Sequence, residues 1–118
     1  MEFIIYHNPR CSKSRQTLSL LESKGVQTRV ELYLKNPLSE RNIKILLEKL
    51  DIHPRDLIRE NEEEFKKSGL TLSSNEQALI RFMAKTPKII ERPIVVCGDR
   101  AVIGRPPENV LELIENED

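Results

Sequence analysis

The stretch 7-HNPRCSKSRQTL-18 decides how the first part of this chain is expected to fold. It follows the apolar residues of 2-EFIIY-6, which are typical of a short buried strand, and an Asn-Pro pair breaks that strand just after His7. From Ser12 to Lys24 apolar residues recur at helical spacing, and Gly25 ends the pattern. The sequence therefore predicts a strand, a loop and a helix, with Cys11 where the helix begins.

A thiol at the start of a helix is placed to act as a nucleophile. The unpaired N–H groups and partial positive charge of that helix end stabilise a thiolate and can hold an anion beside it. Nearby side chains strengthen the prediction of an oxyanion cradle, with hydroxyl donors from Ser12 and Ser14 and positive charge from Lys13 and Arg15. The alternative is a buried, inert thiol, the usual fate of a free cysteine, and these polar neighbours argue against it.

Two other candidate ligands are less specific. His7 either donates a hydrogen bond to the thiolate or its loop, or is a structural histidine whose bonds are satisfied, and both roles stay open. A zinc site made of His7, Cys11, His53 and Cys97 has suitable ligand types, but the spacing matches no familiar zinc pattern, so no metal is predicted.

Cys97 is expected to be a core residue. It lies in an apolar run four residues beyond Pro93, which corresponds to about 13 Å along a strand. If Pro93 lies near Cys11, the two thiols are too far apart to form a disulfide.

Composition limits the class of protein. With 118 residues and 38% hydrophobic content, the chain is expected to form a single domain, residues 1–118. A net charge of zero gives no general attraction for nucleic acid or an anionic membrane. There is no membrane-length apolar run and no secretion signal at the N-terminus, so the protein is expected to be cytoplasmic, with reduced thiols.

The remaining pattern predicts an α/β fold. Residues 26–34 alternate as a strand, with Val26, Thr28, Val30, Leu32 and Leu34 expected on its core face. Helices follow in an insertion at about 38–86, one of them starting at Ser74 with a capping box to Gln77.

The C-terminal part is expected to return to strands and close with a helix. Residues 94–97 and 100–104 form a predicted hairpin around Gly98-Asp99. The closing helix starts near Pro107 and is expected to bury Val110, Leu111 and Ile114.

Four ordered motifs carry a family resemblance. They are HNPxCxxSRxTL near the N-terminus, LIRE in the middle, ERPIVV, and IGRPPENVLELI near the end. On these motifs the chain, from about Phe3 to Ile114, resembles the ArsC family of glutaredoxin-linked arsenate reductases and, within it, the YfgD-like members.

The resemblance implies a thioredoxin-like fold, βαβ…ββα with a mixed sheet, interrupted by the helical insertion. It also implies that Pro93 is cis and faces the nucleophile loop. Cys11 matches the catalytic thiol, and Arg59, Arg92 and Arg105 match the family's three oxyanion-binding arginines. The supporting loop residues are His7, Asn8, Ser12, Lys13, Ser14, Arg15 and Pro93.

The implied activity is reduction of arsenate, or a similar oxyanion, to arsenite through a covalent cysteine–arsenic intermediate. Glutathione is the implied co-substrate and glutaredoxin the partner, with no tightly bound cofactor and a monomeric protein. Ser12-Lys13 departs from the Gly-Thr usual after the nucleophile, and it adds a side chain and a cation to the loop.

Two alternatives stay open. One is another glutathione-linked thiol reductase on the same scaffold. The other is a regulator resembling Spx that binds RNA polymerase, although Ser14 stands where such regulators carry the second cysteine of a Cys-x-x-Cys switch.

Overall fold

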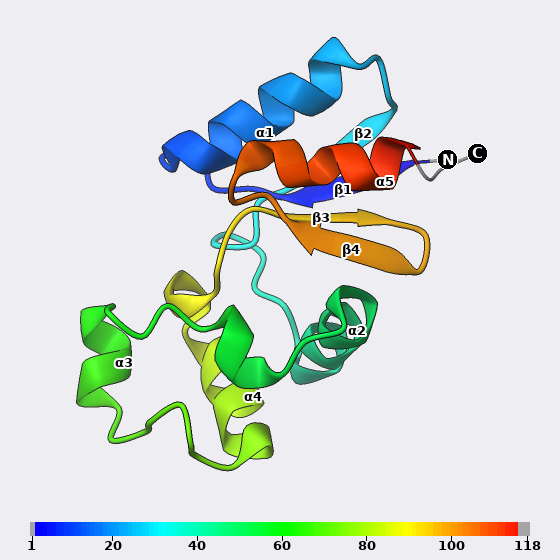
Figure 1. Cartoon of the computed structure of the whole chain (residues 1–118). Coiled ribbons are helices and arrows are strands. Elements are labelled where there is room, and N and C mark those ends of the chain that lie inside the picture. The colour runs from blue at the N-terminus through cyan, green and yellow to red at the C-terminus, as the bar shows by residue number, and fades with distance from the viewer. Residues whose placement is uncertain (1, 116–118) are drawn as a thin grey trace. The chain divides into compact units, whose positions relative to one another are not determined.

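The computed structural model describes residues 2–115 as a chain of short strands and helices (Figure 1). The strands are β1 (Phe3–Tyr6), β2 (Thr28–Glu31), β3 (Ile94–Cys97) and β4 (Arg100–Ile103). The α-helices are α1 (Ser12–Ser23), α2 (Glu40–Leu50), α3 (Glu63–Lys67), α4 (Glu76–Lys85) and α5 (Leu111–Glu115). Three 3-10 turns are η1 (Pro54–Leu57), η2 (Pro87–Ile89) and η3 (Pro107–Val110).

The contacts gather into two compact units. The chain up to Tyr33 and from Arg92 onward forms the first, here called the sheet unit, and Leu34–Glu91 forms the second, the helical unit. The expectation of a single domain with an insertion at about 38–86 stays a prediction.

A mixed four-stranded sheet organises the sheet unit, in the order β2-β1-β3-β4. The β1–β2 pair is parallel, and the β1–β3 and β3–β4 pairs are antiparallel. The hairpin turns at Gly98-Asp99, as predicted, since Cys97 pairs with Arg100 and Gly98 has a φ of 64°. The α/β prediction is confirmed.

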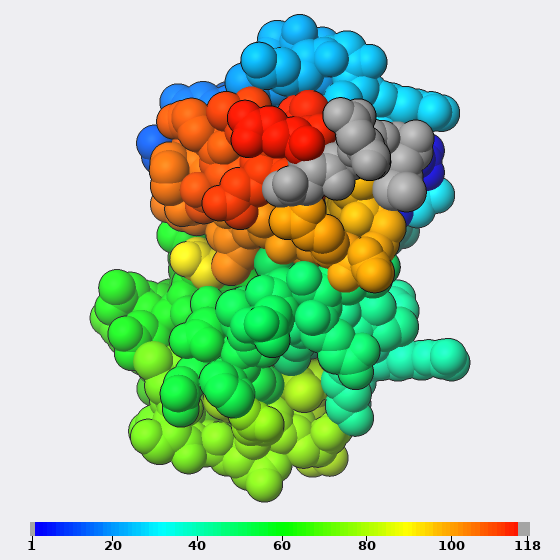
Figure 2. All heavy atoms as spheres, turned by 45° about the vertical axis from the view of Figure 1, so that its right-hand side comes forward, coloured from blue at the N-terminus to red at the C-terminus, as the bar shows by residue number. Residues whose placement is uncertain are grey.

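The core of the sheet unit lies between the central strands and two helical segments. Phe3 and Ile5 of β1 and Val95 of β3 are fully buried and cluster with residues of α1, η3 and α5. Figure 2 shows α5 (red) beside the β3–β4 hairpin (orange). At about 25 cal/mol per Å², burial of these aliphatic and aromatic side chains is the main source of stability.

The predicted core face of residues 26–34 is wrong in part. Val30 is 41% exposed and Leu34 43% exposed, whereas Tyr33 is 2% exposed. The strand is also shorter than expected and lies at the edge of the sheet. The core cluster is built mainly on β1 and β3, so alternation in an edge strand did not identify a buried face.

Two further expectations need correction. The N-cap of α4 is Asn75, whose side chain accepts from the N–H groups of Gln77 and Ala78, and Ser74 instead accepts from the Thr71 N–H. In the closing segment Val110 is buried as predicted, but the next buried residue is Leu113 rather than Leu111 or Ile114. The cause is that the segment starts with a 3-10 turn, which changes the helical phase.

Within residues 2–115, no helix is both long enough and apolar enough to cross a membrane.

Candidate active site

Sheet topology explains why distant motifs meet in the sheet unit. Because β1 and β3 are antiparallel, Tyr6 at the end of β1 pairs with Ile94 at the start of β3, and Ile94 pairs in turn with Ile103 at the end of β4. The loop after β1, the Arg92-Pro93 segment and the Gly104-Arg105 segment therefore leave the sheet at the same end. Pro93 follows a cis peptide bond, as expected, and so does Pro106.

Cys11 is the N-cap residue of α1, as predicted. Its N–H donates to the Asn8 carbonyl at 3.0 Å, and its side chain makes no capping hydrogen bond. Burial alone would raise the pKa of the thiol, but the backbone N–H groups of Ser14 and Lys13 and the Arg92 guanidinium outweigh it, so the Cys11 pKa is lowered. The site thus favours a half-buried thiolate, the reactive form of cysteine.

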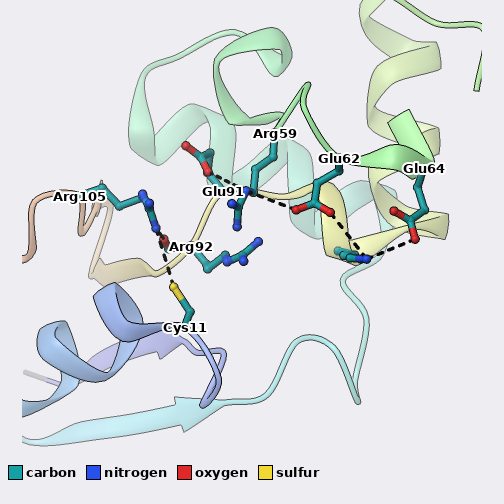
Figure 3. Close-up of polar contacts among 8 residues, drawn as sticks. Cys11, Arg59, Glu62, Glu64, Glu91, Arg92 and Arg105 are labelled. Carbon is teal, nitrogen blue, oxygen red and sulfur yellow. Dashed lines mark hydrogen bonds and ion pairs between the residues drawn. The ribbon is translucent and has the colours of Figure 1, made fainter. Parts of the chain in front are cut away.

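Within the sheet unit, Arg105 contacts the thiol and the Arg92 backbone (Figure 3), and the Arg92 guanidinium favours the thiolate. Arg105 Nη1 donates to Cys11 Sγ at 3.8 Å and to the Arg92 carbonyl at 3.3 Å. The Arg92 Nε is buried and has no hydrogen-bond partner among the residues that the structure describes. A buried N–H group without a partner is costly. Guanidinium groups bind oxyanions through charge-assisted hydrogen bonds, so Arg92 and Arg105 beside the thiol suit a tetrahedral anion.

His7 is bonded to the loop rather than to the thiol. It is 6% exposed, and its Nδ1 lies 2.6 Å from the Ser14 hydroxyl, which also accepts from the Asn8 N–H at 3.0 Å. Burial, and then the positive charge of Arg15, lower the pKa of His7, so the ring is held neutral near pH 7. This bond fits the predicted contact with the nucleophile loop, and it also satisfies the ring as expected for a structural histidine, so both roles stay open.

The predicted hydroxyl donor role of Ser14 is wrong. The side chain is fully buried and its oxygen is occupied by His7 and Asn8, so it cannot meet an external anion. The backbone N–H of Ser14, not its hydroxyl, acts on Cys11.

The other loop residues divide into exposed and bracing positions. Ser12 is exposed and Lys13 is half-buried, with the Lys13 backbone N–H favouring the thiolate. Arg15 donates from Nη1 to the Pro9 carbonyl at 2.9 Å, and the Asn8 side chain accepts from the Arg10 N–H at 3.0 Å. These bonds fix the shape of the loop that presents Cys11.

Arg59 belongs to the helical unit. Its N–H donates to the Ile89 carbonyl at 2.7 Å, and its Nε lies 3.5 Å from a Glu91 oxygen and 3.9 Å from a Glu62 oxygen. Its Nη1 is buried without a partner among residues 2–115. Glu62 in turn pairs with Lys88 at 3.7 Å (Figure 3). The role of Arg59 as a third oxyanion ligand stays a prediction.

Cys97 is buried in β3, where it pairs with Phe3, which confirms its core assignment. Neither Cys97 nor Cys11 forms a disulfide within the described residues. Over the described range 2–115, no group of three His, Cys, Asp or Glu side chains is arranged to hold a metal ion.

Gly104 was not among the predicted site residues, yet it shapes the site. A Cβ at this position would lie 2.6 Å from Thr17 Oγ1 and 2.9 Å from Pro93 Cγ. Its N–H donates to the Pro93 carbonyl at 2.9 Å. Glycine lets α1, the cis-proline segment and the Arg105 segment approach one another, and a glycine at the end of a strand was the signal available in the sequence.

Replacing Gly104 with alanine is expected to destabilise the sheet unit by about 1–3 kcal/mol, because the new methyl group overpacks a closed contact. The midpoint of urea unfolding measures this loss. In a Thr17→Ala background, which removes two of the three crowded atoms, the same change should cost less. An equal cost in both backgrounds would contradict this steric explanation.

Comparison with known proteins agrees with this arrangement. The ArsC family model matches residues 6–113. YfgD of Escherichia coli is 50% identical over 112 residues, which cover 93% of this chain and 94% of that protein. An arsenate reductase of Haemophilus influenzae is 46% identical over 116 residues, covering 97% of this chain and 100% of that protein.

A solved structure gives the same result in three dimensions. An arsenate reductase from Vibrio cholerae superposes with a TM-score of 0.91 at 46% identity, and the match covers 95% of this chain and 97% of that one. The fold is thioredoxin-like, as the motifs implied. Sequence, sheet topology and cysteine loop agree, and the chain belongs to the ArsC family.

Proposed function

We propose that the protein reduces arsenate to arsenite with Cys11 as nucleophile, glutathione as co-substrate and glutaredoxin as the final reductant. The observation that carries this proposal is a thiol with a lowered pKa at the N-terminus of α1, next to the guanidiniums of Arg92 and Arg105. The similarity to proteins named arsenate reductase supports arsenate as the oxyanion.

The chemistry starts with attack of the Cys11 thiolate on arsenic. A sulfur–arsenic bond forms and one arsenic–oxygen bond breaks, and the oxygen leaves as water after taking up protons. Arg92 and Arg105 bind the charged oxygens and stabilise the negative charge of the transition state. The N–H groups in the first turn of α1 can donate to the same oxygens, as expected for anion binding at a helix N-terminus.

Reduction needs two electrons from external thiols. Glutathione displaces a second oxygen and binds arsenic through its sulfur. A glutaredoxin thiolate then attacks that sulfur, the electron pair of the sulfur–arsenic bond passes to arsenic, and a mixed disulfide of glutaredoxin and glutathione leaves. Water releases arsenite and restores the Cys11 thiol, so two thiols are oxidised for each arsenate reduced. Arg59 is proposed as the third oxyanion ligand.

The protein is further proposed to act in the cytoplasm as a monomer without a tightly bound cofactor. Purified protein should form arsenite from arsenate when glutathione and glutaredoxin are both present, and omission of either thiol should stop turnover. Turnover with thioredoxin alone would refute the glutaredoxin step. A folded protein that forms no arsenite under any of these conditions would refute arsenate reduction itself.

Cys97→Ser is expected to leave turnover within about twofold of the wild-type rate, because Cys97 is a core residue of β3 and not part of the nucleophile loop. Its effect should be on stability, a loss of about 1–3 kcal/mol from burying a hydroxyl in place of a thiol. Arsenite formation and urea unfolding, measured on the same preparation, separate the two effects. A folded Cys97→Ser protein without activity would disprove its assignment as a core residue.

A further inference from the structure

The backbone that carries Arg105 is held by side chains from two other segments of the sheet unit. Asn109 Nδ2 donates to the Ile103 carbonyl at 3.0 Å and to the Arg105 carbonyl at 3.2 Å. Between them, the Gly104 carbonyl lies 3.3 Å from the Thr17 hydroxyl, which also donates to the Lys13 carbonyl at 2.8 Å. Side-chain donors therefore reach three successive carbonyls, and the single Thr17 proton is shared between the carbonyls of Gly104 and Lys13.

Asn109 is itself firmly placed. It lies in η3, its N–H donates to the Pro106 carbonyl at 3.0 Å, and the next residue, Val110, is fully buried in the core cluster. A carboxamide nitrogen has two protons, so one Asn109 side chain can serve both carbonyls without sharing a proton. The oxygen of the amide could not take this place, because it would face two other acceptors.

This bracing matters because the guanidinium of Arg105 is at the end of a long, flexible side chain. Arg105 is exposed, and its Nη1 contacts are the Cys11 sulfur and the Arg92 carbonyl. A cation helps a thiolate only while it stays close, and fixing its backbone removes part of the freedom that would carry it away.

We propose that Asn109 is a positioning residue, whose amide holds the Ile103–Arg105 backbone so that Arg105 remains at the Cys11 thiolate and at any oxyanion bound there. The part about a bound oxyanion rests on the proposed function, whereas the part about the Cys11 thiolate does not. The expected consequence is that loss of the amide lowers the reactivity of Cys11 although Asn109 does not contact the sulfur.

The test measures alkylation of Cys11 by iodoacetamide from pH 5 to 10 in the full chain. A Cys97→Ser background leaves Cys11 as the single thiol that can react. Asn109→Ala is expected to slow the reaction at neutral pH by roughly two- to fivefold and to move the midpoint of the pH profile upward. Asn109→Gln keeps the donors on a longer chain and should be intermediate. Glu108→Gln, an exposed neighbour, is the matched control and should leave the profile unchanged.

The decisive comparison is a double-mutant cycle with Arg105→Ala. If Asn109 acts through Arg105, Asn109→Ala should have almost no further effect once Arg105 is gone. The other charged or titratable groups near the nucleophile stay the same in every variant, namely Arg92 and Lys13 beside Cys11, and His7 and Arg15 around Ser14.

Three outcomes would overturn the inference. They are an unchanged profile for folded Asn109→Ala, a shift that persists undiminished in the Arg105→Ala background, or no effect of Arg105→Ala itself. If Asn109→Ala does not fold, Asn109→Gln completes the cycle. Because alkylation needs no arsenate, a protein that forms no arsenite would refute the proposed function without deciding this result.

Discussion

Replacing Cys11 with serine is expected to reduce arsenite formation to the background of the assay, a loss of at least about a thousandfold. A serine hydroxyl keeps its proton at neutral pH, so the N–H groups of α1 and the nearby guanidiniums would have no thiolate to stabilise. In the proposed mechanism, the sulfur–arsenic bond could not form, and each later step needs that bond. Steady-state arsenite production with glutathione and glutaredoxin measures the loss.

Urea unfolding shows whether Cys11→Ser removes only the nucleophile or also destabilises the fold. Position 11 is the N-cap of α1, and serine is one of the favoured N-cap residues, so the variant should unfold at the same or a higher urea concentration. Cys97→Ser is the matched control, since it makes the same atomic change at the other thiol. Substantial turnover by a folded Cys11→Ser protein would refute the covalent mechanism.

Replacing Arg92 with alanine is expected to lower arsenate turnover by about a hundred- to a thousandfold, the usual effect of removing one strong donor from a charged transition state. Arg92 also lowers the pKa of Cys11, so its loss should move that pKa back towards the ordinary value for a thiol. Less thiolate is then present at neutral pH, and the pH profile of turnover should move to higher pH.

Recovery at alkaline pH separates the two roles of Arg92. Raising the pH restores the thiolate but not the lost oxyanion ligand, so turnover by Arg92→Ala should recover only in part. Arg92→Lys keeps the charge without the planar fork of donors and should lie between wild type and alanine. Arg100→Ala, at an exposed position in β4, is the control and should be active. If Arg92→Ala kept full activity on a disulfide substrate and its arsenate turnover were also unchanged, the protein would instead be a different thiol reductase.

The sequence predicted the parts of the site that depend on short-range signals. An Asn-Pro break before a helical pattern placed Cys11 at a helix N-terminus, and Gly98-Asp99 between apolar runs located the hairpin. The cis bond before Pro93 came from the family resemblance instead. Each of these features is set by residues close together in the chain.

What the sequence did not predict depends on which atoms face one another after folding. Whether the Ser14 hydroxyl meets an anion or His7 is decided by burial, and two neighbouring hydroxyls look equivalent in a sequence. The bracing by Asn109 joins segments whose proximity follows from the register of the sheet. The exposure of residues in β2 was not predicted, because apolar and polar residues can alternate in an edge strand although neither of its faces is fully buried.

The absence of a capping hydrogen bond from the Cys11 side chain has a consequence for the relation between catalysis and stability. A helix normally starts with an oxygen that accepts from its first N–H groups, and giving up that oxygen costs about 0.5–2 kcal/mol. At the start of α1 the Cys11 sulfur stands in place of that oxygen, and the N–H groups of Lys13 and Ser14 favour its thiolate form. In the proposed reaction, an oxyanion bonded to the sulfur would offer oxygen acceptors to the same N–H groups, so the helix end that activates the thiol would also stabilise the proposed intermediate.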